Sequence, residues 1–138
     1  MFLALANALQ AIGSSLEVSS EGFVKLGKSE IPLLDLIVWE PLAVRGPVPG
    51  ERARLLVEVS DTTLADDLGR KRTLYAAASV PEYWVVDVFG RALHQYWAPA
   101  DGAYARSAVV PFGEMVRSAT LAGLAVPTAA LDVMKDQG

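Results

Sequence analysis

Two acidic residues, Asp35 and Glu58, each interrupt an apolar run, at residues 33–39 and 55–59. A buried carboxylate without a partner is strongly unfavourable, so each side chain needs a neighbouring basic or backbone group, or a cation. Two carboxylates a few ångströms apart repel each other unless a cation joins them. Mg²⁺, or alternatively Mn²⁺, would suit this pair, with the backbone carbonyl of Val59 as a third ligand. Such an ion activates water for phosphodiester hydrolysis.

Lys71 is the basic residue whose position predicts a role beside these acids. It falls in the middle of the apolar stripe of an expected helix, formed by Leu64, Leu68, Tyr75 and Ala78. An ammonium on a buried face is costly unless it is paired. Its head could reach water, Asp67 one turn earlier could neutralise it, or it could reach carboxylates on the sheet beneath. In the last case its charge would stabilise a reacting phosphate or help to position and deprotonate a water.

A strand, a helix and a second strand between residues 53 and 88 must position these side chains. Residues 55–59 predict a buried strand, and residues 83–87 predict another. One continuous helix is expected over residues 64–78. The oxygen atoms that would cap its first N–H groups come from Asp61, Thr62 and Thr63.

An earlier strand, at residues 31–40, carries Asp35. Because side chains alternate along a strand, one face is expected to hold Leu33, Asp35 and Ile37, and one face of the later strand Leu56, Glu58 and Ser60. Neighbouring strands in a suitable register would therefore place Asp35 beside Glu58. The proline-rich residues 40–50 between the two strands predict an exposed loop.

The order and spacing of these residues resemble the Uma-two family, which belongs to the PD-(D/E)XK, restriction-endonuclease-like superfamily. The resemblance rests on the Asp35 strand, on Glu58-Val59, on Asp67-x-x-x-Lys71 followed by Tyr75, and on the run 80–87, VPEYWVVD. It implies a central mixed sheet flanked by helices and a magnesium-dependent endonuclease acting on DNA. In this site Asp35, Glu58 and Lys71 would be catalytic. The family also commonly forms homodimers.

The chain departs from the family pattern in three places. The superfamily's Glu-x-Lys pattern would put a lysine where this chain has Ser60, so Lys71 on the following helix is the natural substitute. Leu34 stands where the family often has proline, a change that affects entry into the strand more than the chemistry. Family members usually carry more sequence before the first helix, so this chain is expected to be short at its N-terminus.

Several further polar residues are candidates for supporting roles. Ser60, Asp67 and Asp87 are expected around the metal ligands, although Asp87 could instead cap the turn after its strand. Three arginines are candidates for phosphate contacts, although a solvated surface is the more frequent meaning of such residues. They are Arg45, Arg70 and Arg72.

The length and composition of the chain indicate which classes of protein it can belong to. A length of 138 residues predicts one domain, over residues 1–138, and a hydrophobic content of 52% with 20% charged residues is typical of a globular protein. The absence of cysteine excludes a disulfide scaffold and a thiol nucleophile, and it fits a reducing, cytoplasmic setting. Residues 1–13 predict a short apolar core helix, well below the roughly 20 residues of a membrane span.

The sequence therefore predicts an α/β fold, α+β by a stricter convention, and a DNA endonuclease. The net charge of −4 is not that of a typical nucleic-acid-binding protein. It favours the alternative of a catalytically inactive nuclease fold that binds nucleic acid or forms dimers. A third hypothesis is a metal-dependent hydrolase of another phosphate ester.

Overall fold

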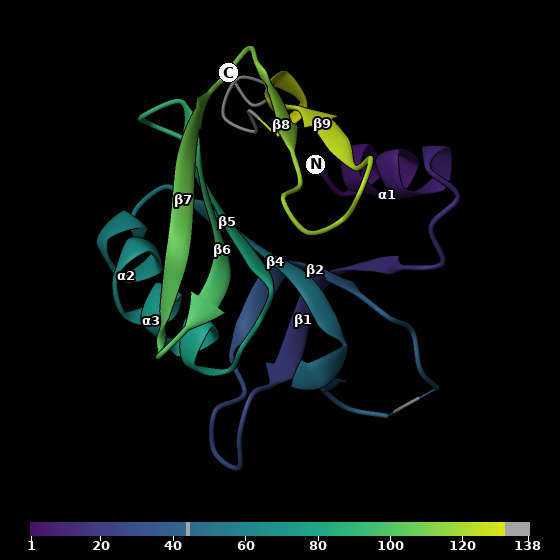
Figure 1. The fold of residues 1–138 in the computed structure, drawn as a ribbon, viewed down its shortest axis with the longest axis vertical. Helices are drawn as coiled ribbons and strands as arrows, with labels where there is room; N and C mark the ends of the chain where they lie inside the picture. The colour runs from purple at the N-terminus through teal and green to yellow at the C-terminus, as the bar shows by residue number, and fades with distance from the viewer. Residues whose placement is uncertain (44, 132–138) are drawn as a thin grey trace.

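A seven-stranded mixed sheet in the order β3-β1-β2-β4-β5-β6-β7 forms the centre of the computed structural model, which describes residues 1–43 and 45–131 (Figure 1). Its strands are β1 (Glu17–Lys25), β2 (Leu33–Trp39), β3 (Val48–Pro49), β4 (Ala53–Ser60), β5 (Glu82–Asp87), β6 (Ala92–Ala100) and β7 (Ala103–Pro111). A second, two-stranded sheet consists of β8 (Met115–Arg117) and β9 (Ala125–Pro127). The helices are α1 (Phe2–Ala11), α2 (Leu64–Leu68) and α3 (Arg70–Ala77), with 3₁₀ turns η1 (Gly50–Arg52) and η2 (Thr128–Leu131).

The strand directions follow from the connections between the strands. Hairpins join β1 to β2, β5 to β6 and β6 to β7, and these pairs are antiparallel, as is β2 with β4. The pair β4–β5 is parallel and is connected through α2 and α3, because parallel strands need a crossover. The predicted α/β class, a mixed sheet with helices on its faces, is confirmed.

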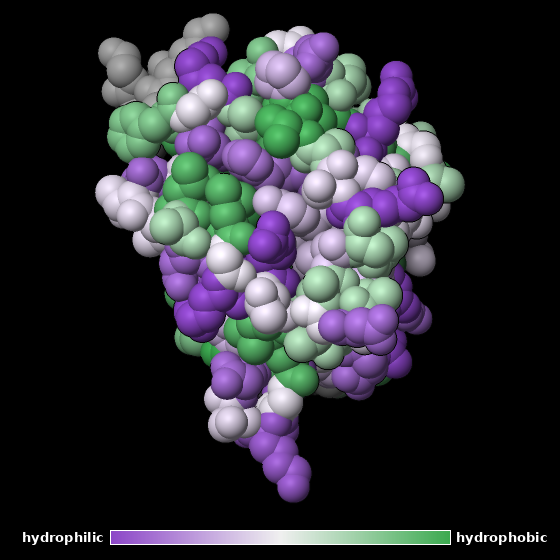
Figure 2. All heavy atoms as spheres, turned by 60° about the vertical axis from the view of Figure 1, so that its left-hand side comes forward, coloured by the Kyte–Doolittle hydropathy of each residue, from purple (hydrophilic) through white to green (hydrophobic). Residues whose placement is uncertain are grey.

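Helices cover both faces of the sheet, so the strands pack against two hydrophobic clusters. Leu5 and Leu9 of α1 pack with alternate residues of the central strands, such as Leu55 and Val57. Tyr75 of α3 packs on the opposite face with residues that include Leu56, Tyr83 and Val85. The face that carries α2 and α3 shows hydrophilic residues between smaller hydrophobic patches (Figure 2). The carboxylates of interest lie on the α2–α3 side.

The prediction of one continuous helix over residues 64–78 was wrong, because the chain breaks at Gly69. Gly69 has φ −108° and ψ −95°, outside the helical region, and separates α2 from α3. A Cβ on this residue would lie 2.9 Å from the carbonyl oxygen of Ala65, so glycine permits the close approach. Lys71 therefore stands in the first turn of α3.

The C-terminal part of the chain forms a second, smaller sheet. The strands β8 and β9 form their own hairpin there. Val116 and Val126, one from each strand, pack into the cluster that α1 covers. Within the described residues, no helix has the length and apolar character needed to cross a membrane.

Candidate active site

Asp35 and Glu58 come together where the ladder between β2 and β4 ends. The antiparallel register pairs Leu36 with Val57, and one step further it brings Asp35 beside Glu58. Asp35 Oδ2 accepts the N–H of Val59 at 2.6 Å, and Glu58 Oε1 accepts the N–H of Asp35 at 3.4 Å. These crossed side-chain to backbone bonds hold the two acids at the junction of the strands.

Lys71 reaches this pair from α3. Its Nζ donates to Glu58 Oε2 at 2.7 Å and lies 2.9 Å from Asp67 Oδ1. The Glu58 and Asp67 side chains are 5% and 1% exposed, whereas the Lys71 side chain is 20% exposed. Of the three explanations for Lys71, the structure combines the second and the third, because the ammonium contacts both Asp67 and a sheet carboxylate.

Asp67 is fixed by two hydroxyl groups. Thr63 Oγ1 donates to Asp67 Oδ2 at 2.9 Å, and the Tyr83 hydroxyl donates to the Asp67 backbone carbonyl at 2.9 Å. The Thr63 side chain makes no capping bond to the helix, so its predicted capping role was wrong: the hydroxyl binds Asp67 instead. A buried tyrosine hydroxyl usually needs a partner, and for Tyr83 the Asp67 carbonyl is that partner.

The electrostatics of the cluster show an excess of negative charge. Burial raises the pKa of Glu58 to about 7, an effect opposed by Lys71 and supported by the charges of Asp35 and Asp67. Burial alone would lower the pKa of Lys71, but the close negative charges of Glu58 and Asp67 raise it to about 12. Glu58 and Asp67 share the Lys71 ammonium, Asp35 lies beside Glu58, and among the described residues no second Lys or Arg forms an ion pair with these three acids.

Two buried hydroxyl groups beside these acids have no hydrogen-bond partner among the described residues. They are Ser60 Oγ and the hydroxyl of Tyr75, whose residues are 1% and 0% exposed. Burial, together with the negative charge of Glu58 and Asp67, raises the pKa of Tyr75 above its usual range. The polar groups around Glu58 thus retain unused hydrogen-bonding capacity.

The remaining predicted site residues lie outside this cluster. Asp87 accepts the N–H of Gly90 at 2.9 Å and so caps the turn after β5, the alternative considered for it. Arg70 pairs with Asp66 on the surface at 2.9 Å, and the Arg72 guanidinium lies 5.2 Å from the centre of the Tyr96 ring. Arg45 is exposed in the loop between β2 and β3. None of these contacts joins an arginine to the acids.

The donor atoms present fit a hard cation better than a soft one. In the part of the chain that the structure describes, no group of three or more His, Cys, Asp or Glu side chains is arranged to hold a metal ion. The available donors are the carboxylates of Asp35 and Glu58 with nearby backbone oxygen. Mg²⁺ is suited to such a sparse oxygen set because it keeps several of its waters.

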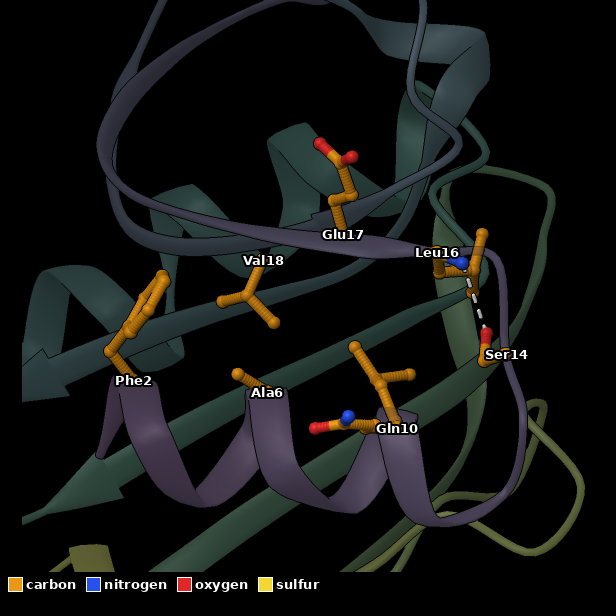
Figure 3. Close-up of a pocket in the computed structure, with 8 residues that line it drawn as sticks. Phe2, Ala6, Gln10, Ser14, Leu16, Glu17 and Val18 are labelled. Carbon is orange, nitrogen blue, oxygen red and sulfur yellow. Dashed lines mark hydrogen bonds between the residues drawn. The ribbon is translucent and has the colours of Figure 1, made fainter.

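A pocket on the surface lies away from these acids. A hollow of about 300 Å³ lies between α1 and β1, where Phe2, Ala6 and Gln10 point toward Val18 (Figure 3). It lies on the α1 side of the sheet, away from Lys71 and Asp67. The hollow is lined by Phe2, Ala6, Leu9, Gln10, Ser14, Leu16, Glu17 and Val18, and none of the clustered acids or Lys71 reaches it.

Comparisons with known proteins agree with this reading of the fold. The sequence pattern of the Uma2 family, described as "Putative restriction endonuclease", matches residues 36–132. A crystal structure of "a putative nuclease belonging to DUF820" from Anabaena variabilis superposes with a TM-score of 0.65 at 11% identity, covering 96% of this chain and 75% of that one. No curated protein matches the sequence. The family match spans most of the chain, so the protein belongs to the Uma2 family of restriction-endonuclease-like proteins.

Proposed function

We propose that the chain is a metal-dependent endonuclease that hydrolyses DNA phosphodiester bonds. The observation that carries the proposal is the junction of β2 and β4, where Asp35 and Glu58 converge and Lys71 binds Glu58 at 2.7 Å. Two acids and a lysine at one strand junction supply both the ligands for a divalent cation and a positive charge for the reacting phosphate. The family match supports the same activity.

Asp35, Glu58 and the backbone carbonyl of Val59 would hold Mg²⁺ or Mn²⁺. The Val59 N–H faces Asp35, and in an extended strand the carbonyl of a residue points to the same side as its N–H. Three acids with one ammonium leave a surplus of negative charge, which a divalent cation would offset. When bound, the ion would lower the pKa of a bound water and withdraw charge from the phosphate.

The chain's own residues would orient the substrate and stabilise charge. Lys71 is partly exposed, so its ammonium can contact a phosphate oxygen while its stem stays packed. Asp67 and Ser60 would lie next to the metal ligands and help to position them without binding the ion. Arg45, Arg70 and Arg72 remain candidate contacts to more distant phosphates. A homodimer, which would place two sites across one duplex, remains an expectation.

Metal titration and plasmid cleavage test the proposal on the same samples. Calorimetry would measure Mg²⁺ and Mn²⁺ binding to the wild type, to Asp35→Ala and to Asp87→Ala, which alters a strand-end aspartate that caps a turn and lies 4.0 Å from His94 Nε2, away from the cluster. We expect the Asp35 variant to lose both metal binding and metal-dependent nicking of supercoiled DNA, and the Asp87 variant to keep both. A wild type that binds neither ion would overturn the proposal.

The net charge of −4 favours one alternative, a catalytically inactive nuclease fold that binds nucleic acid or forms dimers. The same samples separate the two functions. Retention of DNA in a gel-shift assay without metal binding or nicking would support the inactive protein. Nicking that requires Asp35 would exclude it.

A further inference from the structure

The two carboxylate neighbours of Lys71 differ in how they meet its ammonium. Glu58 Oε2 accepts a directed hydrogen bond of 2.7 Å. Asp67 Oδ1 lies 2.9 Å from the same nitrogen but lacks a well-directed donor among the described residues, although the residue is only 1% exposed. Buried acceptors are nearly always satisfied, so this oxygen, which meets the ammonium in an ion pair without a directed hydrogen bond, can still accept one from it.

Asp67 is also the more firmly held of the two acids. Its second oxygen accepts the Thr63 hydroxyl, and its backbone carbonyl accepts the Tyr83 hydroxyl, both at 2.9 Å. Glu58 has a longer side chain, and apart from Lys71 its carboxylate accepts only the 3.4 Å bond from Asp35 N–H among the described residues. Glu58 is therefore the partner that can exchange, and Asp67 is the fixed one.

We propose that Asp67 is a positioning residue that takes over the Lys71 ammonium when Glu58 engages a cation. The exchange frees Glu58 Oε2 for the cation and keeps the lysine charge beside the site. This inference rests on the proposed function and assigns a task to the Thr63–Asp67 pair of α2. Because Lys71 stands on a helix and not on a strand of the sheet, a fixed acid such as Asp67 is needed to position its ammonium.

The Asp67→Asn variant tests the inference, with Asp66→Asn as its matched control. Asp66 is the adjacent residue and pairs with Arg70 at the same i, i+4 spacing, but on the surface. In the Asp67 variant Lys71 keeps only Glu58 as a charged partner, so a cation must displace it without compensation. We expect the calorimetric Kd for Mn²⁺ to rise about tenfold, the scale of one charge-assisted hydrogen bond, and to stay unchanged in the control.

Combination with Lys71→Met shows whether Asp67 acts through the lysine. If it does, Asp67→Asn changes Mn²⁺ affinity in the wild type and has no effect in the Lys71→Met background. An equal loss of affinity in both backgrounds would mean that the Asp67 charge acts on the ion directly, and it would overturn the inference. An Asp67→Asn protein that is merely less stable, with wild-type Mn²⁺ affinity, would overturn it as well.

Two further measurements keep the test decisive. Thr63→Val leaves the Asp67 carboxylate but removes the hydroxyl that holds it, so we expect a smaller rise in Kd, about threefold, and none for the exposed Thr62→Val. Without metal, thermal unfolding of the Asp67 and Lys71 single and double variants should show a coupling of roughly 3–8 °C. Zero coupling would overturn the inference. A wild type that binds no Mn²⁺ would overturn the proposed function and this inference with it, whereas Mn²⁺ binding that Asp67→Asn leaves unchanged would overturn the inference alone.

Discussion

Glu58 and Glu82 are buried glutamates on the neighbouring strands β4 and β5, and their surroundings are opposite. The Glu82 carboxylate is 0% exposed and receives donors from three parts of the chain. These donors are Trp84 Nε1, Gln95 Nε2, Ser118 Oγ, Ala119 N, Thr120 N and Thr120 Oγ1. Glu58 is 4% exposed, and among the described residues its carboxylate accepts only the Lys71 ammonium and a long bond from Asp35 N–H.

The difference in hydrogen-bond donors shifts the pKa values of the two carboxyl groups in opposite directions. Burial acts to raise both, but hydrogen bonds from Ser118, Gln95 and other donors bring the pKa of Glu82 below its ordinary value. At Glu58 burial prevails, and the pKa rises to about 7. The fully hydrogen-bonded carboxylate of Glu82 joins the loop at residues 118–120 to the sheet. The Glu58 carboxylate accepts fewer hydrogen bonds and lies beside Lys71, so it can still bind a ligand. A raised carboxyl pKa of this kind is typical of functional sites.

The contrast predicts that the same substitution will have opposite consequences at the two sites. If the proposed function holds, we expect Glu58→Gln to reduce DNA nicking about a thousandfold, since it would remove a charged ligand of the proposed metal ion. Stability should change little or increase, because an incompletely paired buried charge is lost. Single-turnover cleavage at saturating Mg²⁺ measures the first effect and urea unfolding the second. Full activity in the Glu58 variant would remove Glu58 from the site.

Glu82→Gln should instead damage stability. The amide presents N–H groups to donors that now face carboxylate oxygens, and we expect the free energy of unfolding to fall by about 3 kcal/mol. Urea unfolding of Glu82→Gln beside Glu58→Gln gives the comparison directly. Folded Glu82→Gln protein should keep its Mn²⁺ affinity. Equal destabilisation by the two substitutions would contradict the distinction drawn between the sites.

The pH dependence of stability should separate the two glutamates by sign. The Glu58 pKa is raised from 4.5 to about 7 in the folded protein, so its contribution is fully present below pH 4.5 and is lost as the pH rises through 7. This loss is at most about 3 kcal/mol. The Glu82 pKa is lowered, so its contribution is present above pH 4.5 and is lost as the pH falls below that value.

Urea unfolding between pH 4 and 8 in metal-free buffer measures both slopes. In Glu58→Gln the decline in stability between pH 4.5 and 7 should disappear, while the loss at acidic pH should remain. A wild type whose stability is flat across this range, with the same profile in Glu58→Gln, would show that the carboxyl of Glu58 is ionised as easily in the folded chain as in the unfolded one.

The sequence allowed prediction of the main strands and of the meeting of Asp35 with Glu58. Both acids interrupt apolar runs, and strand alternation with a register set by hydrophobic pairing brings them together. Lys71 was recognisable because a charge stood in an apolar stripe. The break at Gly69 was not, because a helical pattern continues through a single glycine and its cost is only about 1 kcal/mol.

The second buried glutamate escaped prediction, although it stands in the same kind of apolar run. Glu82 directly precedes Tyr83-Trp84-Val85-Val86, so the signal was present in the sequence. Its partners come from residues 84–120, and no local pattern indicates that the loop at residues 118–120 would fold onto β5. Long-range hydrogen bonds of this kind depend on tertiary packing. The unpartnered state of Ser60 Oγ was unpredictable for the same reason.

Two serines give the smallest test of the comparison, because each stands beside one of the glutamates. Ser118→Ala removes a 2.6 Å bond to Glu82 and should lower the free energy of unfolding by about 1–2 kcal/mol. Ser60→Ala removes a buried hydroxyl that has no partner among the described residues, so stability should stay constant or rise by up to about 1 kcal/mol. Urea unfolding of both variants at one pH decides the matter. If Ser60→Ala costs as much as Ser118→Ala, the Glu58 surroundings are as fully bonded as those of Glu82, and the candidate site lacks the spare hydrogen-bonding capacity inferred for it.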